Sequence, residues 1–167
     1  MLRELTTMKH MMKWACVLML VAALPVSAKS FNFDLAKLKL DAPDEWTCEM
    51  DDGKILHMTE PGEGLTIKAY SVDEPDLDAA LKDGNKEVDA VLTDAAIEGE
   101  PSHTDNHGLK AVEVHGKGKS DGKDMSFHVV IVMSEHPVIF IGYGTPEAEA
   151  AHITEIQAIF ASIQPEG

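Results

Sequence analysis

Histidine is the side chain through which this sequence could most readily do chemistry. His115 and His128 stand in strand-like runs on either side of Asp121-Gly122. If that dipeptide is a two-residue hairpin loop, the two imidazoles face each other with Cβ atoms about 5 Å apart. Glu113, two residues before His115, lies on the same face. Imidazole and carboxylate groups bind divalent metals, so the sequence predicts either a metal site at these three residues or a polar patch with ordinary hydrogen bonds.

A second pair of histidines, His103 and His107, is separated by four positions. This spacing suits a zinc site on a helix. The Pro, Asp, Asn and Gly residues around the pair instead favour a turn, and therefore a solvated loop. If the segment were a metal site, its ligands would be His103, Asp105 and His107.

Cys48 is the third group with chemical potential. With Asp52-Gly53 as a two-residue loop, Cys48 faces His57, and a thiolate beside an imidazolium is an activated nucleophile. Apolar neighbours such as Trp46 and Met50 share that face. They favour the alternative, a buried and inert thiol.

The elements that must position these residues are mostly strands. Strand-like runs bounded by turn signals are predicted at 38–43, 46–50, 55–59, 65–72, 109–117, 123–133 and 138–143. Residues 77–92 have helical composition, but Gly84 predicts a broken or irregular helix there.

A final helix is predicted after residue 145. Thr145-Pro146-Glu147 supplies a cap residue, a proline at the first helical position and an early acid. The apolar residues that follow recur at helical spacing and form one stripe: Ile153, Ile156, Phe160 and Ile163. The predicted fold class is therefore α+β, a mainly antiparallel sheet flanked by helices with the amphipathic C-terminal helix packed on the sheet.

Register arithmetic extends the histidine pair into a row. The Asp121-Gly122 loop sets apolar residues 112 and 114 opposite 131 and 129, as a buried face requires. If Glu135-His136 is the next loop, His128 also faces Tyr143. The prediction is a transverse row, His115–His128–Tyr143, on the face opposite the core.

The first 28 residues are predicted to be a cleavable secretory signal peptide. Lys9 and Lys13 form a positive region, residues 14–24 are apolar, and Val26-Ser27-Ala28 places cleavage after Ala28. Eleven apolar residues are too few to span a hydrocarbon core, which needs about 20. We therefore expect a periplasmic or secreted protein with no stable membrane insertion after cleavage.

Two details of this segment have alternatives. The seven residues before Met8 add nothing to the signal pattern, so translation is predicted to start at Met8. Cys16 would suit a lipoprotein, but it lies inside the apolar run and lacks a small apolar box before it.

Residues 29–167 form one acidic domain. They carry eleven lysines, no arginine and 28 Asp or Glu residues, a formal net charge of −17. An acidic domain without guanidinium groups is a poor ligand for phosphates, which disfavours nucleic acid and anionic lipid. The charge serves solubility, or else it attracts a basic partner or divalent cations.

The run Leu38-Lys-Leu-Asp-Ala-Pro-Asp-Glu-Trp46 resembles the opening "strand, Pro, x, x, Trp" of the PsbP/DcrB-like domains. The order hairpin, strand, helical insert, strand meander and final helix is also similar, so the resemblance covers most of residues 31–165. It implies an antiparallel sheet between helices. That family includes extrinsic photosystem subunits, periplasmic proteins and secretion-system chaperones, and it has no shared catalytic motif, so no residue role carries over.

The sequence thus predicts a non-catalytic binding or accessory protein with an unidentified protein partner, and the acidic charge suits a basic one. It lacks a G-x-S-x-G elbow, an H-E-x-x-H helix and a phosphate-binding glycine loop, so we expect no enzyme and no cofactor other than a possible divalent metal. The alternative is a divalent-metal-binding protein that uses surface histidines.

Overall fold

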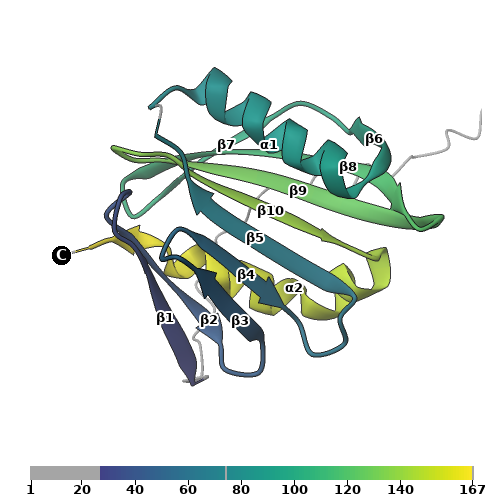
Figure 1. Cartoon of the computed structure of the whole chain (residues 1–167), viewed down its shortest axis with the longest axis horizontal. Helices are drawn as coiled ribbons and strands as arrows, with labels where there is room; N and C mark the ends of the chain where they lie inside the picture. The colour runs from purple at the N-terminus through teal and green to yellow at the C-terminus, as the bar shows by residue number, and fades with distance from the viewer. Residues whose placement is uncertain (1–26, 74, 167) are drawn as a thin grey trace, which may run out of the picture.

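Two β-sheets and two α-helices make up the part of the chain that the computed structural model describes, residues 27–73 and 75–166 (Figure 1). The larger sheet has eight strands in the order β3-β4-β5-β10-β9-β8-β6, and β7 also pairs with β8. The smaller sheet has the order β1-β2-β11. All pairings are antiparallel, so the predicted α+β class is confirmed.

The strands are β1 (Ala28–Phe33), β2 (Leu38–Pro43), β3 (Thr47–Asp51), β4 (Ile55–Thr59), β5 (Leu65–Ser71), β6 (Thr93–Ile97), β7 (Ser102–Asn106), β8 (Leu109–Ser120), β9 (Lys123–Met133), β10 (Val138–Gly144) and β11 (Gln164–Pro165). The helices are α1 (Leu77–Val91) and α2 (Pro146–Ser162). Most of the predicted signal peptide, residues 1–26, lies outside the described residues. Among the described residues no helix is long and apolar enough to span a bilayer.

The helices cover opposite faces of the larger sheet (Figure 1). On one face α1 packs on β9 and β10, and its buried residues Ala80 and Val88 share a core with Val129. On the other face α2 and the smaller sheet enclose a second core, in which Ile159 lies with Phe140. Successive strand residues point to opposite faces, so each position in the sheet belongs to either the α1 face or the α2 face.

The helix α1 is continuous, and the prediction of a break at Gly84 is wrong. Gly84 is buried against the sheet, where a Cβ atom would lie 2.9 Å from Val129 Cγ1. The glycine therefore allows the helix to approach the sheet closely. The N-terminus is capped by Asp76, whose carboxylate accepts a hydrogen bond from the backbone N–H of Asp78 at 3.2 Å.

The helix α2 begins as predicted. The Thr145 hydroxyl accepts a hydrogen bond from the backbone N–H of Ala148 at 3.2 Å, and Pro146 occupies the first turn. Ile159 and Ile163 are buried in the core beneath the helix. The predicted docking of this helix on the sheet is confirmed.

One of the three predicted hairpin registers is confirmed. Asp121 and Gly122 both have positive φ, 50° and 77°, and their two-residue turn sets His115 opposite His128. The predicted register of β9 with β10 is wrong by one residue, because Val138 pairs with Val132 and not with Met133. A shift of one residue reverses which face each side chain occupies.

The same error affects the hairpin of β3 and β4. Lys54 adds a third residue to the Asp52-Gly53 loop, and β3 pairs Cys48 with Met58 and Glu49 with His57. The predicted pairing of Cys48 with His57 is therefore wrong. Cys48 belongs to the α2 face and His57 to the α1 face.

Candidate functional site

His115 and His128 lie side by side on the α2 face of the larger sheet. Their rings stack with centroids 6.0 Å apart and planes inclined by 26°. Tyr143 does not extend this row as predicted, because it pairs with Phe127 on the α1 face. Gly142 takes the position opposite His128.

His128 is held between two carboxylates from different elements. Its Nδ1 lies 3.0 Å from Glu113 Oε1 on β8, and its Nε2 lies 2.8 Å from Glu149 Oε1 on α2. Glu149 also accepts a hydrogen bond from the Ser126 hydroxyl. We call Glu113, His115, Ser126, His128 and Glu149 the His128 cluster.

The carboxylates fix the charge of this cluster. Burial lowers the pKa of His128, but the hydrogen bonds to Glu113 and Glu149 and their negative charges outweigh it and raise the pKa to about 9. The hydrogen bond from His128 lowers the pKa of Glu149 against the opposing effect of burial. At neutral pH His128 is therefore an imidazolium that donates from both ring nitrogens.

This geometry does not favour the predicted metal site at His115, His128 and Glu113. A metal ligand needs a free lone pair on a ring nitrogen, and both nitrogens of His128 donate to carboxylates. Across residues 27–73 and 75–166, no group of three or more His, Cys, Asp or Glu residues is arranged to hold a metal ion. The cluster instead joins β8, β9 and α2.

His103 and His107 also have different surroundings from those predicted. Residues 102–106 form the strand β7 and not a loop, and His103 lies opposite Val112. The turn follows at His107 and Gly108, both with positive φ. The loop prediction is wrong because β7 is a polar edge strand without an apolar alternation to reveal it.

This turn reaches the C-terminal end of α2. The Asn106 side chain donates to the carbonyl oxygens of Phe160 and Ile163, at 2.9 and 3.3 Å. His107 Nε2 lies 3.2 Å from the carbonyl oxygen of Ala161. Asn106 and His107 thus contact carbonyl groups of the last turn of α2 and its cap, where the Phe160 carbonyl oxygen also accepts from the backbone N–H of Ile163 at 3.3 Å.

Cys48 lies partly buried on β3, where its Sγ is 3.6 Å from the carbonyl oxygen of Trp46. Burial raises the pKa of its thiol, against the opposing charge of Lys29. With His57 on the other face of the sheet, nothing in this arrangement activates the thiol as a nucleophile.

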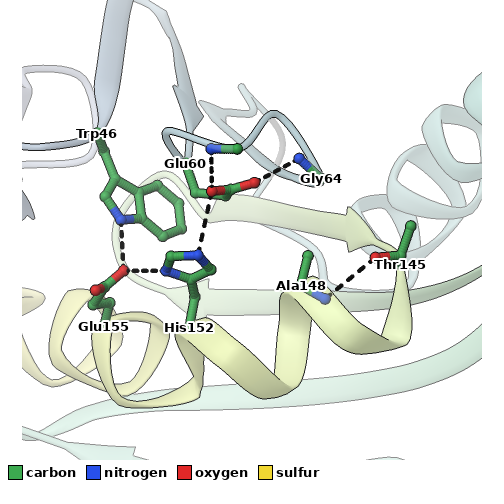
Figure 2. A network of polar contacts seen from close by, with 8 residues as sticks. Trp46, Glu60, Gly64, Thr145, Ala148, His152 and Glu155 are labelled. Atoms are coloured by element: carbon green, nitrogen blue, oxygen red, sulfur yellow. Dashed lines mark hydrogen bonds and ion pairs between the residues drawn. The ribbon is translucent and has the colours of Figure 1, made fainter.

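A second polar cluster, which sequence reasoning missed, surrounds His152 on α2 (Figure 2). His152 Nδ1 lies 2.6 Å from Glu155 Oε2, and its Nε2 lies 3.2 Å from Glu60 Oε2. The Trp46 indole N–H donates to Glu155 at 2.9 Å, and the Trp46 and His152 rings meet edge to face. We call Trp46, Glu60, His152 and Glu155 the His152 cluster.

Glu60 anchors this cluster and is only 4% exposed. Its carboxylate accepts hydrogen bonds from the backbone N–H groups of Gly62 and Gly64, both at 2.5 Å. The bond from Gly62 lowers the pKa of Glu60, and the bond from Gly64 and the charge of His152 add to the effect against burial. The only available sequence signal was a Glu before a Pro-Gly-x-Gly turn, and it does not reveal a partner at position 152.

On the α1 face, α1 covers β9 and β10 and contacts β5 through Glu87 and Asp83, and it leaves β3 and β4 open. Three side chains in register, Glu49, His57 and Lys68, form a row across β3, β4 and β5. Lys68 Nζ contacts Glu87 of α1 at 2.5 Å. A shallow cavity of about 160 Å³ lies at this end of the row and is lined by His57, Lys68, Glu87, Val91, Ile141 and Tyr143.

Next to it, the Tyr70 hydroxyl donates to Asp83 of α1 at 2.9 Å. Burial, and then this contact with Asp83, raise the pKa of Tyr70 well above its usual range. The polar groups between α1 and the sheet are thus largely engaged with each other, and they hold the helix in place.

Comparison with known proteins shows a shared fold. No family model and no curated protein matches the sequence. Among solved structures, the chain is similar to cyanobacterial PsbP (CyanoP) from Synechocystis sp. PCC 6803, with a TM-score of 0.62 and 10% identity over 87% of this chain and 96% of that one.

Two further structures have the same fold. LpqN of Mycobacterium tuberculosis, a protein involved in cell envelope biogenesis, matches with a TM-score of 0.54 and 14% identity over 86% of each chain. PA94 of Pseudomonas aeruginosa matches with a TM-score of 0.53 and 14% identity over 84% of this chain and 98% of that one. The predicted resemblance to PsbP/DcrB-like domains is confirmed at the level of the fold.

Proposed function

We propose that this chain is an exported, envelope-associated accessory protein that works by binding a protein partner and catalyses no reaction. The observation that carries the proposal is that the imidazole rings of the His128 cluster and the His152 cluster are engaged in contacts within the protein. Both ring nitrogens of His128 and of His152 contact carboxylates, and the pairs His128–Glu149 and Glu60–His152 join α2 to the rest of the fold. These groups stabilise the structure and are not free to move protons to or from a substrate.

The fold supports an envelope role. LpqN is described as involved in cell envelope biogenesis, and CyanoP is a cyanobacterial PsbP. A domain of this fold with a large acidic surface suits recognition of another protein.

The signal-like start supports export. The predicted cleavage follows Ala28, the first residue of β1. It removes Ser27, whose carbonyl oxygen accepts a hydrogen bond from the backbone N–H of Asp44. Cleavage there removes the apolar segment and leaves almost all of β1 in place. In the periplasm the remaining thiol, Cys48, has no partner for an internal disulfide among residues 29–167.

Fractionation of the native cell tests export. We expect the protein in the periplasmic or envelope fraction, with Lys29 as its first residue by N-terminal sequencing and intact mass. A cytoplasmic protein that retains residues 8–28 would contradict the proposal.

Cross-linking in the intact envelope tests the accessory role. We expect one defined protein partner that is captured reproducibly and released by salt, since an acidic surface binds through screened charges. Turnover of a small molecule by the purified protein, abolished by a substitution at His128 or His152, would overturn the non-catalytic assignment.

A further inference from the structure

The strand β3 ends the larger sheet with a regular, open edge. It pairs with β4 without a register shift, and its outer side has no partner strand among the described residues. The opposite end of the sheet is different, because β6 contains a register irregularity next to Asp94, whose φ is 54°. Such bulges hinder the addition of another strand at β6. The edge strand β7 is regular but carries a single carboxylate, Asp105, whereas β3 carries two, Glu49 and Asp51.

The residues along this edge are strongly acidic. From position 44 to 52 the chain carries five exposed carboxylates and no basic side chain: Asp44, Glu45, Glu49, Asp51 and Asp52. The Asp51 side chain is 73% exposed, and its Oδ2 lies 3.9 Å from His57 Nε2. Lys29 Nζ reaches the start of this segment and donates to the carbonyl oxygens of Asp44 and Trp46, at 3.1 and 3.3 Å. The strand β3 itself, Thr47–Asp51, combines an outer side without a partner strand among the described residues with two exposed carboxylates, Glu49 and Asp51.

The two faces of β3 differ in character. Glu49 and Asp51 point to the open α1 face, whereas Cys48 and Met50 pack against the core of the α2 face. A strand added beside β3 would place its alternate side chains about 5 Å from these residues. Basic residues would meet the carboxylates, and apolar residues would extend the core next to Met50.

We infer that the β3 edge binds an extended segment of a basic protein partner by strand addition, with lysine or arginine at alternate positions and apolar residues between them. This inference rests on the proposed accessory function and names its partner chemistry. A second copy of this chain is a poor occupant, because antiparallel pairing centred on Glu49 sets two Glu49 carboxylates opposite each other. Main-chain hydrogen bonds would provide affinity and the acids would provide selection.

The test uses the full chain and a fluorescent peptide, acetyl-Lys-Val-Lys-Val-Lys-amide, with affinity measured by fluorescence anisotropy at low salt. A peptide of the same sequence with every backbone nitrogen methylated keeps its charge but cannot pair as a strand. We expect binding of the first peptide and at least tenfold weaker binding of the second. We also expect slower hydrogen exchange within residues 47–51 in the complex.

The matched variants are Glu49→Gln/Asp51→Asn on the edge and Asp121→Asn/Asp124→Asn on the distant β8–β9 hairpin, which change net charge equally. The edge variant should bind about tenfold more weakly, through loss of two cross-strand ion pairs, and the hairpin variant should match the unmodified chain. Equal effects of both variants, or equal binding of the methylated peptide, would show diffuse charge attraction and overturn the inference. Absence of binding would show that the acids only protect the edge from aggregation, and the accessory function would then use another surface.

Discussion

His128 Nε2 on β9 lies 2.8 Å from Glu149 Oε1 on α2, and this contact connects the centre of the larger sheet to the helix that covers its α2 face. Glu113 holds the other side of the same imidazolium at 3.0 Å. Three turns of helix separate this anchor from the Asn106 contacts at the C-terminal end of α2. The position of α2 thus depends on charged contacts as well as on its apolar stripe.

Replacement of His128 by Gln should reveal its charge as a pH dependence of stability. The folded-state pKa of about 9 lies above the ordinary value of 6.5. The stabilisation is therefore fully present below about pH 6.5 and is lost as the pH rises through about 9. At pH 7 we expect the variant to lose about 2–3 kcal/mol of unfolding free energy, since two carboxylates lose their cation.

Urea denaturation of both proteins from pH 6 to 10 measures the difference. His115→Gln is the matched control: His115 is exposed and stacks on His128, and its loss should cost less than about 0.5 kcal/mol. A difference between wild type and His128→Gln that does not change with pH would contradict a charged cluster.

Glu60→Gln should lower the free energy of unfolding at neutral pH but not at acidic pH. The amide presents an N–H group where the carboxylate accepts from Gly62 or Gly64, so we expect a loss of about 1–3 kcal/mol at pH 7. Because the folded-state pKa is lowered, the wild-type advantage exists above about pH 4.5 and disappears as the pH falls through the folded-state value. Chemical denaturation at pH 3 to 7 tests this, with the exposed Glu63→Gln as control.

Gly84→Ala should destabilise the protein although alanine favours helices. The added Cβ would lie 2.9 Å from Val129 Cγ1, so overpacking outweighs a helix-propensity gain of about 1 kcal/mol and leaves a net loss of about 1–2 kcal/mol. The exposed Asn85→Ala in the same helix should be neutral or stabilising. Addition of Val129→Ala should remove much of the penalty of Gly84→Ala, and a purely additive double mutant would refute the proposed contact.

Cys48 should react slowly with alkylating reagents. Burial raises the pKa of its thiol, so little thiolate exists near neutral pH. Mass spectrometry of Cys48 after iodoacetamide treatment should show modification at least tenfold slower than in the urea-unfolded chain. Rapid, selective labelling at pH 7 would point to an activated cysteine.

Zinc, copper and nickel should not bind stoichiometrically at micromolar concentration. The predicted ligands His115, His128 and Glu113 are close together, but His128 has no free ring nitrogen. Isothermal titration calorimetry at pH 7 measures this. One bound metal per chain that is lost in His115→Ala/His128→Ala would support the metal-binding alternative.

The sequence predicted both helices, seven of the eleven strands of the described residues and the pairing of β8 with β9, because the local signals for these were strong; it missed β1, β6, β7 and β11. Asp121-Gly122 selects a two-residue turn, and the turn fixes the register. In each of the other two hairpins the register places one residue more in the loop than the sequence predicted. This residue is Lys54 between β3 and β4, and Ser134 between β9 and β10. One residue is enough to move Tyr143 and His57 to the opposite face from the one predicted.

The remaining errors arise from tertiary contacts. Gly84 weakens an isolated helix, but close packing on Val129 overrides this local preference. His152 and Glu60 are far apart in the sequence, and neither belongs to a motif that would indicate the other. The strand β7 lacks apolar alternation because both of its faces are largely exposed.

The position of α2 in the chain also sets the order in which the two sides of its core become available for folding. Every strand of the larger sheet precedes α2, so in a chain that crosses a membrane from its N-terminus those strands emerge first. Until α2 brings Glu149 and Ile159 to the sheet, His128 lacks one of its two counterions and the core on the α2 face is not closed. The α2 face can therefore close only after every strand of the larger sheet is available.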